Sequence, residues 1–125
     1  PLTNIHINKK ITKEKAPLSV GMSIHPGIAT GHVRIINDSK KIQKIIPGEI
    51  IVISKISLKS LPYFKNAKAL VTDEFLTTSH SKVFLKKYLS IPVVTGAKDA
   101  TKTFKNCDLI TVNGQNGDIY KGSLI

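Results

Sequence analysis

Short runs of branched apolar residues, separated by glycine and proline, dominate this sequence from residue 18 onward. Glu49–Ile53 follows the turn Pro47-Gly48 and is almost continuously apolar, as expected of a strand buried on both faces. A chain patterned in this way predicts a sheet of many short strands. The other predicted strands are Val20–Ile24, His32–Ile36, Ala69–Thr72, Pro92–Thr95, Leu109–Asn113 and Asp118–Tyr120.

Helical patterns are fewer than strand patterns. The clearest predicts a helix over Ser79–Leu89, because Thr78 or Ser79 can cap its start and apolar residues recur along it. Strands with interspersed helices predict a mixed α/β class. Shorter helices are predicted over Lys40–Ile45, Ser57–Asn66 and Ala97–Phe104.

The length and composition fit one folded domain preceded by an arm. The chain has 125 residues, of which 41% are hydrophobic, and this is enough for a single packed core. A charged stretch that ends at Pro17 predicts a linker or N-terminal arm over residues 1–17, and the domain over residues 18–125. Because the chain does not begin with Met, we expect it to be a piece of a longer protein.

The net charge of +11 raises the possibility of a nucleic-acid partner, through release of condensed counterions. The basic residues are 18 Lys and the single Arg34, however, and the lysines are spread along the chain. Three Tyr, four Phe and no Trp form no stacking pattern, so no nucleic-acid partner is expected. Abundant Lys, Ile and Asn, whose codons are AT-rich, indicate that genome composition explains much of the charge.

Simple counts argue against a membrane-spanning segment and against cysteine-based stabilisation. No run of about 18 apolar residues is present, so no membrane partner is expected. Cys107 is the only cysteine, which excludes internal disulfides and cysteine-rich zinc sites. His25 and His32 lack a third ligand, so no metal site is predicted.

The segment Val71–His80 has the pattern of a strand, a polar loop and the start of a helix. His80 would lie in the first helical turn, where free N–H groups and the helix dipole favour an anion. An imidazole at this position can attack phosphorus, with Thr78 and Ser79 facing the phosphate and Lys82 adding positive charge. The alternative is that His80 only fills a loop–helix junction and the hydroxyls cap the helix. Asp73 is expected to have a turn or cap role rather than an acid–base role with Glu74.

Several motifs follow one another in an order that resembles the mobile, or swivelling, phosphohistidine domain of phosphoenolpyruvate-utilising enzymes. They are Pro26–Gly31, Pro47–Val52, Thr72-Asp73, Thr78–His80, Ile91–Gly96, Ala100-Thr101, Ile110–Gly114 and Gly117–Gly122. The resemblance covers roughly residues 18 to 123. It implies a mixed α/β fold, a swivelling β/β/α three-layer sandwich in which one helix starts at His80 and packs on a mixed sheet.

The resemblance also implies an activity. In such enzymes the histidine of this motif is phosphorylated, and the domain swings between a nucleotide site and a pyruvate site. By motif position that histidine is His80, with Thr78, Ser79 and Lys82 around the phosphate. No cofactor is implied in this domain, while Mg²⁺ is implied in the catalytic domain of the parent protein and K⁺ is left open. The implied partners are the catalytic domains of the same polypeptide and neighbouring subunits of a homo-oligomer. The implied location is intracellular, in the cytoplasm, with an organelle left open.

Two features favour one branch of this family. Gly96–Lys105 and the ending Gly117–Gly122 most resemble the extra C-terminal domain of pyruvate kinases, and Phe75-Leu76 replace a Gly-Gly pair before the histidine motif. The first expectation is therefore an appended structural or regulatory domain of a pyruvate kinase, with a degenerate phosphohistidine loop. The alternative is an active carrier domain of the phosphoenolpyruvate synthase or pyruvate phosphate dikinase type, with His80 shuttling the phosphoryl group. In either case the isolated chain is not expected to turn over substrate.

Overall fold

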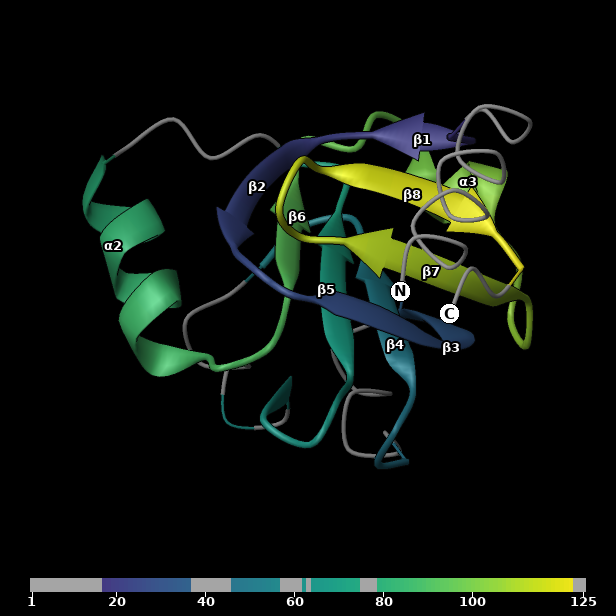
Figure 1. Ribbon diagram of the computed structural model, residues 1–125, viewed down its shortest axis with the longest axis horizontal. Coiled ribbons are helices and arrows are strands. Elements are labelled where there is room, and N and C mark those ends of the chain that lie inside the picture. The colour runs from purple at the N-terminus through teal and green to yellow at the C-terminus, as the bar shows by residue number, and fades with distance from the viewer. Residues whose placement is uncertain (1–16, 37–45, 57–61, 63, 75–78, 123–125) are drawn as a thin grey trace, which may run out of the picture.

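The computed structural model describes residues 17–36, 46–56, 62, 64–74 and 79–122, with the backbone alone for residues 79–82 and 84 (Figure 1). Residues 1–16 of the predicted arm, the predicted helix over Lys40–Ile45 and six of the ten residues of the one over Ser57–Asn66 lie outside these residues. The strands are β1 (Ser19–Val20), β2 (Met22–His25), β3 (Ile28–Ile36), β4 (Ile50–Ile53), β5 (Ala69–Thr72), β6 (Val93–Thr95), β7 (Leu109–Asn113) and β8 (Asp118–Lys121). The helices are α2 (Ser79–Tyr88) and α3 (Ala100–Thr103).

The strands form one eight-stranded sheet in the order β1-β8-β7-β3-β4-β5-β6-β2. The pairs from β3 through β6 are parallel, and the remaining pairs are antiparallel. Strand β3 belongs to both halves, since Ile28–His32 pair with β7 and Val33–Ile36 pair with β4. Strands β1 and β2 lie at opposite ends of the order but are separated by Gly21 alone, so the sheet nearly closes into a barrel.

Two hydrophobic clusters lie on opposite faces of the parallel strands. On one face Ile51, Leu70 and Val93 pack with Leu85 of α2 and with Leu89, which follows the helix. On the other face their sequence neighbours pack against the antiparallel strands, because alternate residues of a strand point to opposite faces. This second cluster includes Ile50, Val71, Val94, Phe104, Ile110, Val112 and Ile119.

In place of the predicted three layers of sheet, sheet and helix, the structure has one nearly closed sheet with α2 packed on one face, and the predicted mixed α/β class overstates the helices. The fold is mostly β, because α2 has 10 residues and α3 has 4. The prediction also missed the closure of the sheet, which depends on the pairing of distant strands. Neither described helix is long and apolar enough to cross a membrane.

Glycine makes the closure possible at two positions. The N–H of Gly21 donates to the carbonyl oxygen of Gly117 at 2.9 Å. A Cβ atom on Gly21 would lie 2.5 Å from the carbonyl oxygen of Thr95, and one on Gly117 would lie 2.0 Å from the carbonyl oxygen of Gly21. Gly117 also has a φ of 84°, which disfavours other residues. The predicted strand Val20–Ile24 is consequently broken at Gly21.

Candidate functional site

The carboxyl ends of β4, β5 and β6 meet at one edge of the parallel sheet, called the carboxyl edge below. Helix α2 connects β5 to β6 and runs antiparallel to both strands, so its first turn is on the side of the molecule where these strands end, out beyond β2 (Figure 1). Ligands of parallel sheets commonly bind outside the carboxyl ends of the strands. His80 is the second residue of α2, so its backbone is on the side of the molecule where the parallel strands end.

Backbone hydrogen bonds hold the start of the loop after β5 against the segment after β4. The N–H of Asp73 donates to the carbonyl oxygen of Ile53 at 3.1 Å, and that of Glu74 donates to Ser54 at 3.0 Å. These bonds continue the parallel pairing of β4 and β5 beyond the last residues of the strands. The loop that leads to α2 therefore begins from a fixed position.

The segment after β6 holds the same loop from its other side. The N–H of Gly96 donates to the carbonyl oxygen of Glu74 at 2.8 Å, and that of Ala97 donates to Thr72 at 2.9 Å. The Thr72 hydroxyl donates to the carbonyl oxygen of Glu74 at 2.9 Å. Thr72 and Glu74 are thus tied both to each other and to the neighbouring strand.

Asp73 joins this edge to helix α3. Its Oδ1 atom accepts the N–H of Thr101 at 3.0 Å, and its Oδ2 atom accepts the Thr101 hydroxyl at 2.5 Å. Asp99 precedes α3 with a φ of 58°, and its side chain makes no capping bond. Asp73 therefore caps α3 from the end of β5, and the predicted turn or cap role of Asp73 is confirmed.

A buried hydroxyl without a hydrogen-bond partner among the described residues lies at the same edge. Thr95 is fully buried, and its Oγ1 atom has no partner in the part of the chain that the structure describes. Val93 packs on the side of the sheet that α2 covers, so Thr95, two residues later, is on that side as well. Leaving such a group unpaired costs about 1–3 kcal/mol.

The structure describes only the backbone of three of the four predicted site residues, so the predicted phosphate site stays a prediction. Ser79, His80 and Lys82 belong to the first turn of α2, but their side chains are outside the described part of the structure, as is all of Thr78. Two exposed lysines that the sequence analysis did not single out also follow strands at this edge. They are Lys55 after β4 and Lys98 after β6. Their common signal is that each comes two or three residues after a buried parallel strand.

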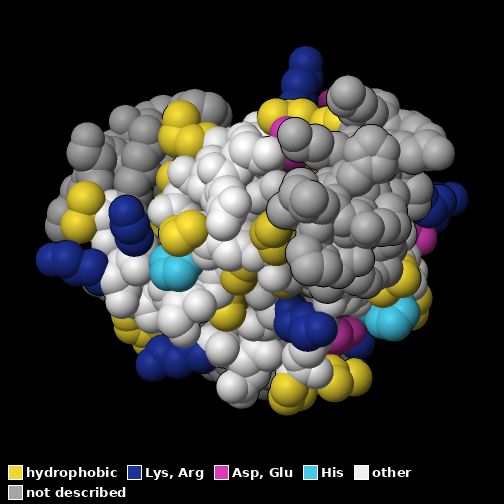
Figure 2. Space-filling model, viewed as in Figure 1, with side chains coloured by type: hydrophobic (Ala, Val, Ile, Leu, Met, Phe, Trp, Pro, Cys, Tyr) yellow, Lys and Arg dark blue, Asp and Glu magenta, His cyan; other side chains and the backbone are white. Residues whose placement is uncertain are grey.

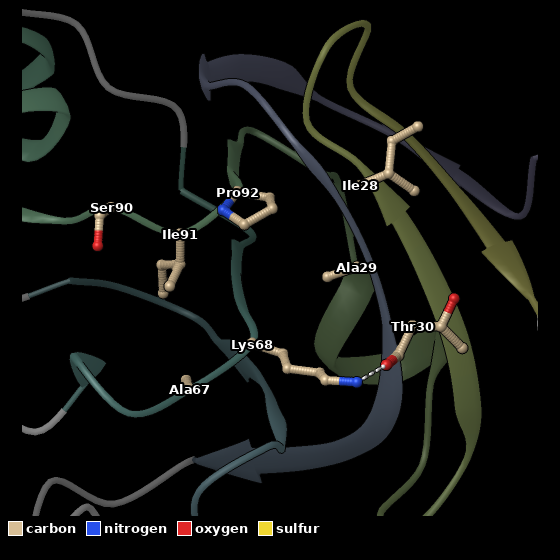
Figure 3. A pocket seen from close by; sticks show the side chains of 8 residues that line it. All are labelled: Ile28, Ala29, Thr30, Ala67, Lys68, Ser90, Ile91 and Pro92. Atoms are coloured by element: carbon tan, nitrogen blue, oxygen red, sulfur yellow. Dashed lines mark hydrogen bonds between the residues drawn. The ribbon is translucent and has the colours of Figure 1, made fainter. Parts of the chain in front are cut away.

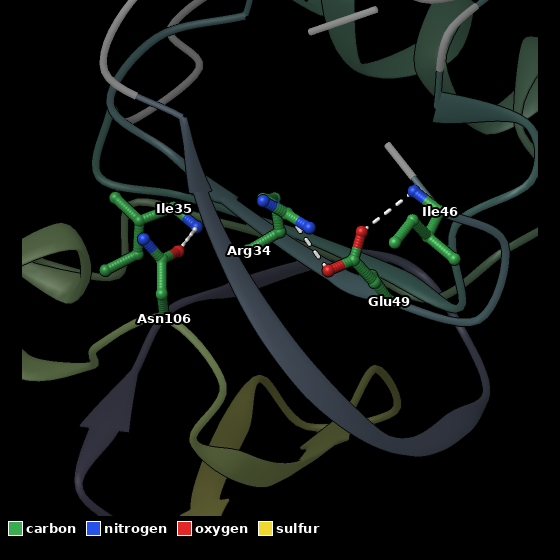
Figure 4. Close-up of polar contacts among 5 residues, drawn as sticks. All are labelled: Arg34, Ile35, Ile46, Glu49 and Asn106. Atoms are coloured by element: carbon green, nitrogen blue, oxygen red, sulfur yellow. Dashed lines mark hydrogen bonds and ion pairs between the residues drawn. The ribbon is translucent and has the colours of Figure 1, made fainter. Parts of the chain in front are cut away.

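Arg34, Glu49 and His25 make hydrogen bonds that stabilise the fold. The only arginine, Arg34, pairs with Glu49, with 3.0 Å between its Nε atom and Oε2 (Figure 4). The Oε1 atom of Glu49 accepts the N–H of Ile46 at 2.8 Å, so this pair fixes the turn before β4. His25 hydrogen-bonds through Nδ1 to the carbonyl oxygen of Pro26 at 3.0 Å. Among the described residues, no three His, Cys, Asp or Glu side chains gather as metal ligands would.

The lysines form no single patch on the face shown in Figure 2. Lys and Arg side chains are scattered over that face between hydrophobic and uncharged surface. This distribution agrees with their even spacing in the sequence. It gives no support on this face to a continuous basic surface of the kind that nucleic acids require.

The family of the chain follows from comparison with known proteins. Residues 45–117 match the family model of the PEP-utilising enzyme, mobile domain, where PEP is phosphoenolpyruvate. This match covers more than half of the chain, and the chain belongs to that family.

Similar curated proteins are much longer than this chain. A probable phosphoenolpyruvate synthase of Archaeoglobus fulgidus is 35% identical over 131 residues, which cover 99% of this chain and 17% of that protein. The phosphoenolpyruvate synthase of Pyrococcus furiosus is 40% identical over 102 residues, covering 82% of this chain and 12% of that protein. An uncharacterized phosphotransferase of Bacillus subtilis is 35% identical, over 79% of this chain and 12% of its own. The chain thus spans about a sixth or less of these relatives.

These relatives do not support the first expectation from the sequence, a pyruvate kinase parent. They are phosphoenolpyruvate synthases and a phosphotransferase, and they favour the alternative reading. The earlier preference depended on Gly96–Lys105 and Gly117–Gly122. In the structure these segments contain α3, β8 and their turns, which build the fold and do not distinguish one parent enzyme from another.

Solved structures support the fold alone. Aconitase X of Thermococcus kodakaraensis has a TM-score of 0.61 at 17% identity, covering 84% of this chain and 98% of that chain. An NMR structure of Enzyme I has a TM-score of 0.54 at 19% identity, covering 65% of this chain and 33% of that chain. The same fold therefore occurs in proteins with different names, and function must be argued from the site.

Proposed function

We propose that this domain carries a phosphoryl group on His80 between two sites of a phosphotransferase of the phosphoenolpyruvate synthase type. The observation that carries the proposal is the position of His80 in the first turn of α2, on the side of the molecule where the parallel strands end. The similarity to phosphoenolpyruvate synthases over 82–99% of the chain supports the same reading.

The chemistry consists of two phosphoryl transfers. In the first, an imidazole nitrogen of His80 attacks the phosphorus of a donor, an N–P bond forms, and the leaving oxygen takes the electron pair of the broken P–O bond. In the second, the enolate oxygen of pyruvate attacks the phosphorus, the N–P bond breaks, and the imidazole recovers its electron pair. Phosphoenolpyruvate is the product of this second step.

The first turn of α2 supplies the stabilisation that such a group needs. The N–H groups of a helix N-terminus lack intrahelical partners, and the helix dipole favours negative charge there. We assign Thr78 and Ser79 as hydroxyls that face the phosphate and Lys82 as its charge partner. The bonds from Asp73 and Glu74 to the neighbouring segments hold the residues at which the chain leaves β5 toward this turn.

The two ends of the described domain lie side by side, and this supports rotation of the whole domain as a rigid body. The N–H of Leu18 donates to the carbonyl oxygen of Ile119 at 2.9 Å, and Ser19 pairs with Ile119 in the sheet. Residue 17 precedes β1 and residue 122 follows β8, so both lie at the same end of this antiparallel strand pair. Connections that leave a domain side by side allow it to turn as a rigid body, which delivery between two sites requires.

We also propose the partners, the cofactor and the cellular location of the domain. The partners are the catalytic domains of the same polypeptide, together with neighbouring subunits of a homo-oligomer. No cofactor belongs to this domain, and Mg²⁺ belongs to the catalytic domain of the parent. The location we propose is the cytoplasm.

A second candidate function is a domain that keeps the fold without phosphoryl transfer. The observation that favours it is the pair Phe75-Leu76, which replaces the Gly-Gly pair usual before the histidine motif. Glycine allows backbone conformations and close ligand approach that larger residues do not. Under this reading Ser79 and His80 serve only to begin α2.

The test is phosphorylation of the full-length protein. It is incubated separately with ATP and with phosphoenolpyruvate, and intact mass is followed for an acid-labile, base-stable adduct of one phosphoryl group. We expect the adduct in the wild-type protein, none in His80→Ala, and an unchanged adduct in the control His32→Ala. Turnover that continues in His80→Ala without an adduct would favour the second candidate.

A further inference from the structure

Strand β3 is longer than the neighbour with which it pairs in parallel. Strand β4 pairs with β3 only from Val33 onward, whereas β7 already pairs with it from Ile28. The first part of β3 therefore has a partner strand on one side. On its other side no described strand is paired with Ile28–Thr30.

The backbone groups of Ile28 and Thr30 face this open side. Val33 exchanges two hydrogen bonds of 2.8 Å with the loop before β7, and the carbonyl of Gly27 accepts the N–H of Gly114 at 2.6 Å. Gly27 and Val33 thus direct their backbone groups toward β7. Because alternate residues of a strand face opposite edges, Ile28 and Thr30 direct theirs away from it.

The open edge borders a groove of about 640 Å³ at the amino ends of β5 and β6 (Figure 3). Ile91 and Pro92 form part of its opposite wall, and Lys68 lies between this wall and Thr30. The side chain of Ile28 is 48% exposed beside the groove. The groove therefore combines apolar surface with a strand edge that no described strand pairs.

Lys68 is the only charged residue among the described residues that line the groove. Its Nζ atom donates to the backbone carbonyl oxygen of Thr30 at 2.9 Å. A carboxylate is a stronger acceptor for an ammonium group than a neutral carbonyl. A second copy of this chain would bring another Lys68 to the same edge, and lysine at a strand edge opposes such pairing. The charge therefore favours an acidic partner over self-association.

We propose that the edge Ile28–Thr30 is a strand-pairing site for an extended peptide segment that carries a carboxylate. The backbone of the segment pairs with Ile28 and Thr30, and one of its apolar side chains packs against Ile91 and Pro92. Lys68 releases the carbonyl of Thr30 and binds the carboxylate. The site does not depend on the proposed role of His80, because it uses the opposite edge of the sheet.

The test uses the ¹⁵N-labelled chain and a synthetic probe, the capped pentapeptide Val-Glu-Val-Thr-Val. Strand pairing depends mainly on backbone bonds, so one alternating sequence is a sufficient probe. We expect the probe to shift the amide signals of Ile28 and Thr30 and to slow their hydrogen exchange. The same peptide with glutamine in place of glutamate should bind about fivefold more weakly, and a peptide N-methylated at alternate residues should not bind.

Two variants separate the contribution of Lys68 from that of the net positive charge of the chain. Lys68→Met keeps the aliphatic stem and should remove the difference in affinity between the glutamate and glutamine peptides. Lys121→Met, at an exposed position on β8, should preserve it. The proposal is overturned if the probe shifts only other amides, or if the amides of Ile28 and Thr30 are already protected in the free chain. Concentration-dependent self-association through this edge in sedimentation experiments would also overturn it.

Discussion

The two edges of the parallel sheet differ in how completely their backbone groups are paired. At the carboxyl edge, residues 72–74 are bonded to the segments after both neighbouring strands, and Asp73 also caps α3. At the amino edge, the start of β3 has no described strand on one side, and a lysine side chain occupies one of its carbonyls. The comparison teaches that one sheet can offer a rigid edge suited to positioning a reactive loop and an open edge suited to binding a strand.

The largest expected effect on stability concerns the near-closure of the sheet at Gly21 and Gly117. Gly117→Ala places a Cβ atom 2.0 Å from the carbonyl oxygen of Gly21, at a φ of 84°. We expect the free energy of unfolding to fall by about 3 kcal/mol, from overpacking and left-handed strain.

The control is Gly48→Ala, where φ is 93° but no atom lies within 4 Å of the added Cβ. In urea unfolding it should lower the free energy of unfolding by only about 1 kcal/mol, the part that comes from left-handed backbone strain. Equal losses for the two variants would show that the closure is not tightly packed.

Asp73→Asn tests the rigidity of the carboxyl edge. It weakens both bonds to Thr101, and we expect a loss of about 1–2 kcal/mol in the free energy of unfolding, as for a lost helix cap. Amide shifts should change near Gly96 and Ala97 and stay unchanged at Ile28. Asp99→Asn, at a position without a capping bond, should stay within about 0.5 kcal/mol of wild type. Shifts that reach Ile28 would break the distinction between the two edges.

Thr95→Val tests the buried hydroxyl beneath α2. Because its Oγ1 atom has no partner, we expect the substitution to raise the free energy of unfolding by about 1 kcal/mol. Thr72→Val is the matched control, since its hydroxyl donates to Glu74 at 2.9 Å, and it should lose about 1 kcal/mol. A loss of stability in Thr95→Val would reveal a partner for that hydroxyl.

The smallest expected effect lies on β8, away from both edges. Burial, and then the hydrogen bond to Asp118 and the charge of Asp118, raise the pKa of Tyr120 above its usual value of 10.0. The folded state therefore holds the phenolic proton more tightly than the unfolded state. Stability from this group is complete below pH about 10 and is lost as pH rises through the folded pKa. Tyr120→Phe should show a shallower decline in urea unfolding above that pH, and parallel curves would contradict the assignment.

Local pattern was enough to predict the strands whose ends carry strong turn signals. The predicted bounds Ala69–Thr72 and Leu109–Asn113 are those of β5 and β7. The start of the site helix was predicted within one residue, since α2 begins at Ser79. Helix α3 is shorter than predicted, because Asp99 has a left-handed backbone conformation and the helix begins only after it.

Features that depend on distant pairing could not be predicted in this way. Asp73 was expected to cap or turn, but its partner Thr101 is 28 residues away in the sequence. The break at Gly21 exists because the chain passes there from one end of the sheet to the other. The open edge of β3 depends on the register of two different pairings, which no local pattern encodes.

The central claim is most directly tested by following the phosphoryl group through the second transfer. The full-length protein is labelled with radioactive phosphate from its donor, freed of small molecules, and mixed with pyruvate in a rapid-quench experiment. The account predicts that label leaves His80 and appears in phosphoenolpyruvate at least as fast as steady-state turnover. Label that stays on the protein while phosphoenolpyruvate forms at the normal rate would contradict it.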